Sequence, residues 1–191
     1  MRYPPEHKQQ ARESIVEASG RAFRRHGYDG VGIDGLAKEA GVTSGAFYGH
    51  FKSKKLAFRE IAVRGLVELR DAIANLQAEC GDGWIAPFVD FYLSERRTCD
   101  LGESCALQSL TPDVMRADKA TRASYGQEFA RVVDQVAKGL PQFAPEVARQ
   151  KAIALLALLS GGVTVARGTV SSEQSAAIAD ALRLAAEEIV A

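Results

Sequence analysis

The chain has 191 residues, 47% of them apolar and 25% charged, and its 24 basic side chains balance 24 acidic ones. A chain of this size can bury one substantial core, or a small domain beside a larger one. Its most apolar stretch, residues 152–159, is far too short to span a membrane, and its first residues lack the apolar segment of an export signal, so we expect a cytoplasmic protein without membrane contact.

The residue pattern predicts an all-helical fold. Helix formers dominate, and glycines, prolines and Ser or Thr caps mark the expected helix ends. The expected helices cover residues 8–26, 33–40, 43–51, 54–80, 84–97, 105–111, 118–138, 145–167 and 172–191. These are about nine helices, preceded by an extended arm that contains Arg2, Pro4 and Pro5. A natural seam inside the fourth helix divides the chain into domains 1–54 and 55–191.

Residues 33–55 contain two short helices joined by a tight turn. Leu36 belongs to the apolar face of the first helix, and Gly41 tolerates the positive φ that can end it. Thr43 can cap the second helix, whose Phe47 and Phe51 point inward four residues apart. The pattern therefore predicts a helix-turn-helix.

The second of these helices leaves a face of small and polar residues. They are Thr43, Ser44, Gly45, Ala46, Tyr48, Gly49 and His50. Small side chains let a helix approach the major groove closely, and hydroxyl groups can meet phosphates or base edges. We therefore expect this helix to bind double-stranded DNA. The charge distribution agrees, because residues 1–55 carry ten Lys or Arg against six Asp or Glu.

The stretch GVTSGAFYGHFKSKKLAF, residues 41–58, resembles the TetR (AcrR-type) family of bacterial one-component regulators. The family signature is G-V-[ST]-x-x-x-[LF]-Y-x-[HY]-F-x-[SN]-K, and the resemblance covers residues 10–60 without a gap. It implies a DNA-binding domain joined through the fourth helix to an effector domain. It also implies a homodimeric repressor that a small-molecule effector releases from a palindromic operator.

The resemblance assigns individual DNA contacts. It implies phosphate contacts for Tyr48 and Lys54, and a phosphate at Lys54 would also satisfy the free N–H groups of a helix N-terminus. His50 is either a phosphate donor or a surface residue. The positions nearest base edges are Thr43, Ser44, Gly45 and Ala46. Two departures from the family are Gly49, where relatives carry a bulky aromatic residue, and Asp34, where they carry a cation.

The expected helix at 145–167 is apolar around most of its surface, so it must be buried on several sides. Ser160, Gly161 and Gly162 would let two helix backbones approach closely. The resemblance implies a homodimer through the eighth and ninth helices, which would present two recognition helices to a two-fold operator, and the apolar surface of the eighth helix agrees with it. The alternative is a monomer in which the eighth helix is central.

Aromatic residues repeat at helical spacing in the fifth and seventh expected helices, and most of them should be core. The resemblance implies that an effector pocket opens among helices five to eight. The expected lining residues are Trp84, Phe88, Phe91, Tyr92, Cys105, Gln108, Ser109, Tyr125 and Phe129. An aromatic pocket with few charges favours a small apolar or aromatic effector.

Two other interpretations stay open. Cys105 stands at an expected helix start, where the helix dipole favours a thiolate, so the same scaffold could sense oxidants or electrophiles. Free cysteines are also often small buried hydrophobes. Alternatively, the chain is a helical ligand-binding or adaptor protein whose DNA binding has lapsed, which Gly49 and Asp34 would allow. The chain contains no G-x-S-x-G, G-K-[ST] or H-E-x-x-H pattern and no clustered histidines, so we expect no enzyme, cofactor or metal.

Overall fold

The computed structural model describes residues 5–191, which form eleven α-helices and two short 3-10 helices with no strand among them. In chain order the helices are α1 (Pro5–Gly30), α2 (Ile33–Glu39), α3 (Ser44–His50), α4 (Lys54–Cys80), η1 (Gly81–Gly83), α5 (Ile85–Leu93), α6 (Glu95–Thr98), η2 (Leu101–Glu103), α7 (Ala106–Ser109), α8 (Thr111–Arg116), α9 (Lys119–Lys138), α10 (Pro145–Arg167) and α11 (Ser172–Val190). The predicted all-helical fold is confirmed.

Three predicted helix boundaries are wrong. Pro5 begins α1 instead of belonging to an extended arm, because the first turn of a helix tolerates a residue without an N–H; Arg2 and Pro4 lie outside the described residues. The single helix expected at 84–97 is divided at Ser94, where ψ is −80°. The helix expected at 105–111 is divided at Leu110, since Pro112 has no N–H to continue its hydrogen bonds.

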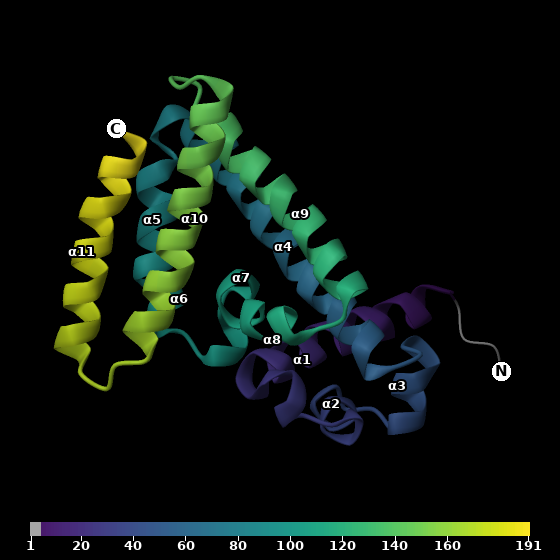
Figure 1. Cartoon of the computed structure of the whole chain (residues 1–191). Coiled ribbons are helices and arrows are strands. Elements are labelled where there is room, and N and C mark those ends of the chain that lie inside the picture. Colours follow the sequence, from purple (N-terminus) through teal and green to yellow (C-terminus); the bar gives the residue numbers. More distant parts are fainter. Residues whose placement is uncertain (1–4) are drawn as a thin grey trace.

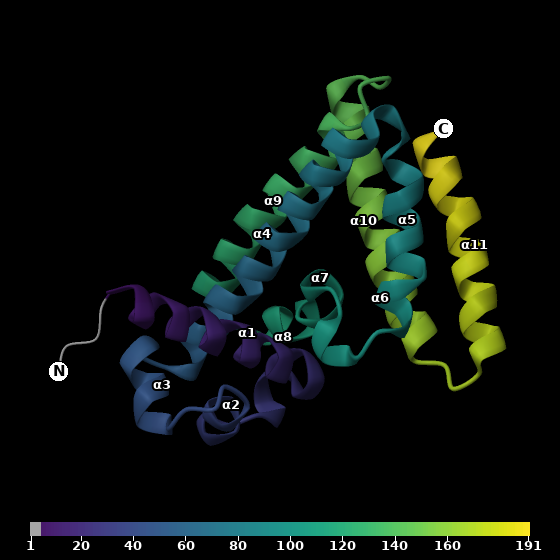
Figure 2. The same ribbon diagram turned by 180° about the vertical axis from the view of Figure 1, so that it is seen from behind.

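The helices form a triangular outline, which Figure 1 and the reverse view in Figure 2 show. Helices α4 and α9 pack side by side along one edge, and α10 packs with α5 and α11 along the other. The short helices α7 and α8 lie between the two edges, next to the end of α4 where α1, α2 and α3 are gathered. Helix α4 therefore reaches from the N-terminal helices to the far end of the molecule.

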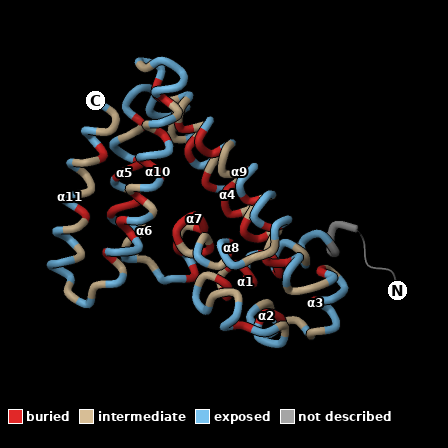
Figure 3. Tube along the Cα trace, viewed as in Figure 1, coloured by how far each residue is buried: buried red, intermediate tan, exposed pale blue. Residues whose placement is uncertain are grey.

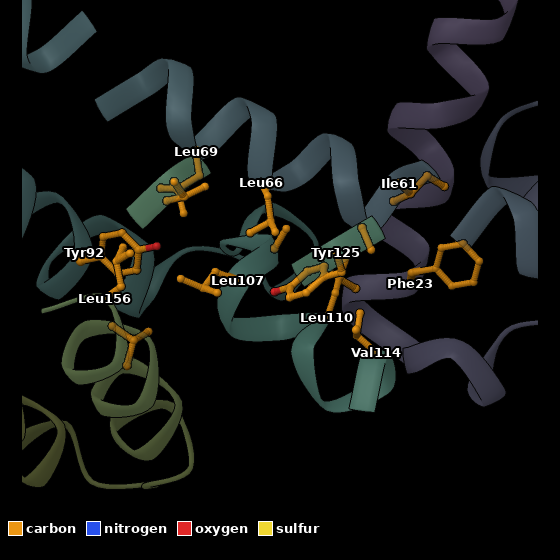
Figure 4. Close-up of a cluster of buried hydrophobic side chains, with 14 of the residues drawn as sticks. Phe23, Ile61, Leu66, Leu69, Tyr92, Leu107, Leu110, Val114, Tyr125 and Leu156 are labelled. Atoms are coloured by element: carbon orange, nitrogen blue, oxygen red, sulfur yellow. The ribbon is translucent and has the colours of Figure 1, made fainter. Parts of the chain in front are cut away.

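One continuous apolar core connects the N-terminal helices with the rest of the chain. Phe23 of α1 and Ile61 of α4 belong to it, and Figure 4 shows them in the same cluster as Leu66, Leu110 and Tyr125. Figure 3 shows buried residues along the facing sides of α4 and α9 and exposed residues on the outer side of α11. The proposed domains 1–54 and 55–191 thus meet across packed side chains.

Two glycines allow helices to approach closely within the chain. A Cβ at Gly65 of α4 would lie 2.3 Å from the Cβ of Ala106 in α7, and a Cβ at Gly162 of α10 would lie 2.3 Å from Cδ1 of Leu182 in α11. Gly162 therefore serves the packing of α10 on α11 of the same chain, which corrects the expectation that it faces a second subunit. Gly161 has no atom near the position of its Cβ and faces outward.

Candidate nucleic-acid interface and adjoining cavity

The turn between α2 and α3 is built by Gly41. Its φ of +66° belongs to the left-handed region that glycine adopts readily. The N–H of Val42 donates to the carbonyl of Ala37 at 2.9 Å, and the N–H of Gly41 donates to the carbonyl of Lys38 at 3.1 Å. These two bonds form a Schellman motif, which ends α2 and satisfies its last carbonyl groups. The predicted tight turn is confirmed.

Side-chain caps fix where α3 and α4 begin. Thr43 Oγ1 accepts a hydrogen bond from the N–H of Ala46 at 3.2 Å, and Ser53 Oγ accepts one from the N–H of Leu56 at 3.2 Å. The hydroxyl of Ser44 donates to the Asp34 carboxylate at 2.5 Å. Asp34 therefore ties α2 to α3, a role that the sequence analysis missed although the two residues are only ten positions apart.

Helix α3 turns one side to the core and the other to solvent. Phe47 is fully buried against Phe51, whose ring centroid lies 5.3 Å away, whereas Tyr48 is 54% exposed. Thr43, Gly45, Ala46 and Gly49 are also exposed, and Ser44 and His50 are half-buried. Helix α3 lies at the outer edge of the N-terminal helices (Figure 1). Its polar side is therefore accessible along its whole length.

The basic side chains near α3 differ in whether they already have a partner within the chain. Lys54 lies with Nζ 4.3 Å from the centre of the Tyr28 ring, and Arg12 is paired with Glu60. Lys38 and Lys52 are exposed, and neither has an ion pair in the part of the chain that the structure describes. Their positions beside α3 make them further candidates for phosphate contacts. Lys52 could have been found from the sequence, because a basic residue two positions after the end of α3 lies close to that helix.

A cavity of about 400 Å³ opens where α1, α4 and the segment from α5 to α7 meet. Three of the expected pocket residues line it, namely Phe91, Tyr92 and Cys105. The Cys105 sulfur lies 2.8 Å from the Tyr92 hydroxyl, and burial raises the pKa of Tyr92 well above its usual range. The other walls carry several arginine and glutamate side chains, so the cavity is more charged than the aromatic pattern predicted.

The other expected pocket residues do not line this cavity. Trp84 and Phe88 are buried, and the indole N–H of Trp84 donates to the carbonyl of Gly139 at 2.8 Å. Tyr125 is buried with its hydroxyl 2.6 Å from that of Thr111, and burial raises its pKa to about 12. The remaining three are Gln108, which is buried, and Ser109 and Phe129, which are half-buried.

A polar junction fastens α4 to the start of α9. Asp118 caps α9 by accepting hydrogen bonds from the N–H groups of Ala120 and Thr121 and from the Thr121 hydroxyl. Arg59 of α4 donates to both Asp118 and Thr121, and Lys55 lies 3.7 Å from Asp118. The Thr121 hydroxyl, its N–H and the lysine charge together lower the pKa of Asp118 to about 2. The carboxylate is therefore ionised at neutral pH.

Within residues 5–191, no group of three or more His, Cys, Asp or Glu side chains is arranged to hold a metal ion. None of the helices described combines the length and the apolar character that a bilayer crossing requires.

The N-terminal third of the chain matches known regulators in sequence. Residues 15–63 match the family model described as bacterial regulatory proteins, tetR family. The HTH-type transcriptional regulator LmrA of Bacillus subtilis is 31% identical over 77 residues, which are 40% of this chain and 39% of that protein. The Transposon Tn10 TetC protein of Escherichia coli is 35% identical over 74 residues, which are 39% and 37% of the two chains. The chain thus matches under two fifths of either relative's length.

Solved structures share the whole fold. NemR of Escherichia coli in its reduced form has a TM-score of 0.80 at 18% identity, over 95% of this chain and 97% of that chain. The TetR-family regulator of Cytophaga hutchinsonii has a TM-score of 0.82 at 16% identity, over 98% and 96%.

An exposed helix-turn-helix joined to a larger helical body is typical of DNA-binding transcriptional regulators. Within this class, residues 15–63 match the TetR family in sequence, and the whole chain has the fold of TetR-family structures; members of that family are DNA-binding regulators and commonly repressors.

Proposed function

We propose that this protein is a homodimeric repressor that inserts α3 into the major groove of a palindromic operator and leaves it when a small effector binds. The observation that carries the proposal is the exposed polar side of α3. Tyr48 is 54% exposed there, beside a helix N-terminus that holds Lys54. An exposed tyrosine hydroxyl and a helix N-terminus are both suited to DNA phosphates.

The residues divide into two groups by the contacts they would make. Tyr48, Lys54 and Lys52 are suited to phosphates, and His50 lies beside them at the end of α3. The residues nearest the bases are Thr43, Ser44, Gly45 and Ala46. Short side chains of this kind make single contacts instead of the bidentate bonds that arginine makes with guanine. Recognition therefore depends partly on the shape of the operator.

An exposed apolar strip supports the dimer. Ile153 and Val165 of α10 and Leu184 of α11 are 44%, 60% and 64% exposed. Ala157 and Gly161 are exposed between the first two, at helical spacing. Large apolar side chains left exposed on two helices that pack together favour an interaction surface on these helices. A second copy of α10 and α11 packed on this face would place two copies of α3 on one side of the dimer, as a two-fold operator requires.

The test is DNA binding by the purified protein. We expect fragments selected from genomic DNA to share a palindrome, and Kd for a labelled fragment to rise steeply with salt. Lys54→Ala should reduce the slope of log Kd against log salt by about one unit. Lys138→Ala is the matched control, because Lys138 is exposed at the far end of α9. Unselective retention of fragments would favour the adaptor interpretation, and an unchanged slope would refute the phosphate contact.

A second candidate function is thiol sensing. The observation that favours it is the Cys105 sulfur, which lines the cavity and lies 2.8 Å from the Tyr92 hydroxyl. An electrophile that adds to this sulfur would disturb the contact between α5 and α7. If so, N-ethylmaleimide should weaken DNA binding of the wild type and of Cys80→Ser, but not of Cys105→Ser. Equal loss in all three would exclude the sensor.

A further inference from the structure

The cavity beside α1 contains a cation that the fold leaves without an ion pair. Arg24 extends from α1 between two glycines, so that Nη1 lies 3.2 Å from the position of a Cβ at Gly20 and Nη2 lies 3.6 Å from that of a Cβ at Gly65. Larger side chains at these two positions would crowd the guanidinium. The sequence thus provides space for an arginine between α1 and α4.

The guanidinium is also short of hydrogen-bond acceptors. Its Nε is buried without a partner in the described structure, and Nη1 reaches only the carbonyl of Gly102, at 3.5 Å. No carboxylate of the described residues lies within ion-pair distance, although Glu68 and Glu103 are near enough to stabilise its charge. Burial lowers the pKa of Arg24 below its usual value. A partly buried charge without an ion pair loses part of its hydration uncompensated, and such groups are typical of functional sites.

The neighbouring arginines are better satisfied. Arg64 is paired with Glu68 at 3.0 Å, and Arg96 donates to the carbonyl of Glu103 and lies over the Phe91 ring. Arg21, which also lines the cavity, has no ion pair among the described residues, but none of its nitrogen atoms is buried without a partner. The arginine nitrogen that lines this cavity and is buried without an acceptor is therefore Nε of Arg24.

The remaining walls restrict the occupant. Apolar side chains of Phe91, Leu69 and Ile61 line the space, and its volume of about 400 Å³ lies in the lower range of small-molecule sites. Carboxylates on the walls, among them Glu17 and Glu68, would repel a ligand with several negative charges. We propose that this cavity binds a small monocarboxylate with an apolar body, whose carboxylate pairs with Arg24. Binding of the acid at Arg24 does not depend on the proposed function; only an effect of the acid on DNA affinity rests on it.

The proposal is tested by calorimetry without DNA, using octanoate and 4-phenylbutyrate as probes with their uncharged amides. At least one acid should bind with Kd below about 1 mM and at least about tenfold more tightly than its amide, because arginine–carboxylate hydrogen bonds are charge-assisted. Arg24→Gln should abolish this preference. Arg122→Gln, an exposed change on α9, is the matched control and should preserve it. Ala72→Phe, which fills the cavity from its exposed rim, should weaken acid and amide alike.

Three results would overturn the site. They are equal binding of acid and amide, an unchanged preference in Arg24→Gln, and no acid binding below about 1 mM. If Arg24→Gln does not fold, Ala72→Phe and the comparison of acid with amide in the wild type still decide. DNA affinity is measured separately, so an acid that binds without changing it supports the site and contradicts only the proposed effector role.

Discussion

The close approach of α4 to α7 gives a quantitative test of the structure. Gly65 stands in the middle of α4, where alanine is the better helix former by about 0.8–1.0 kcal/mol. Its Cβ would lie 2.3 Å from that of Ala106, whereas carbon atoms in contact lie about 3.5–4.0 Å apart. Gly65→Ala must therefore move α7, and overpacking of this kind costs about 1–3 kcal/mol. We expect a net change in unfolding free energy from about zero to about 2 kcal/mol destabilising.

The matched control is Gly126→Ala in α9, where nothing lies near the position of the new Cβ. This variant gains only the helix propensity and should be stabilised by about 0.5–1 kcal/mol. Urea unfolding of both variants at one protein concentration gives the difference, which we expect to be about 1–3 kcal/mol. If Gly65→Ala is stabilised as much as Gly126→Ala, α4 and α7 are not in the close contact described.

Two further predictions concern the polar junction and the apolar strip. The pKa of Asp118 is lowered from 3.8 to about 2, so its stabilising effect is complete above pH 3.8 and is lost as the pH falls through 2. Asp118→Asn should therefore lower the urea midpoint at pH 7, with the difference from wild type shrinking between pH 4 and 2; a constant difference would contradict this. Val165→Asp should produce monomers in analytical ultracentrifugation while helicity is unchanged. An unaltered sedimentation coefficient would contradict the placement of α10 in the dimer interface.

The features that could be predicted from the sequence are local ones. The cap at Thr43, the cap at Ser53 and the turn at Gly41 each depend on hydrogen bonds that span only a few residues. Residue types therefore reveal them directly. The break before Pro112 was equally local, and the proline was a sufficient signal for it.

The full lining of the cavity could not be predicted, because its walls come from three distant parts of the chain. Periodicity marks Tyr92 and Trp84 alike as inward-facing, but only tertiary packing puts Tyr92 at the cavity and Trp84 against Gly139. The position of Arg24 has the same origin. Its neighbours Gly65 and Gly102 are 41 and 78 positions away, and nothing in the sequence indicates that they meet.

The contacts of α1 explain how the cavity and α3 would be coupled. Three polar contacts tie the C-terminal part of α1 to the body of the molecule, beside the apolar core to which Phe23 belongs; they run from Arg24 to the carbonyl of Gly102, from Arg25 to Asp100, and from the N–H of Tyr28 to Asp113. A carboxylate that draws Arg24 away from Gly102 would weaken the first of these and leave α1 held by the other two and by the apolar core. Helix α1 packs on α2, which carries α3, so the orientation of α3 would follow. Linkage then requires that operator DNA weaken carboxylate binding by the same factor by which the carboxylate weakens DNA binding.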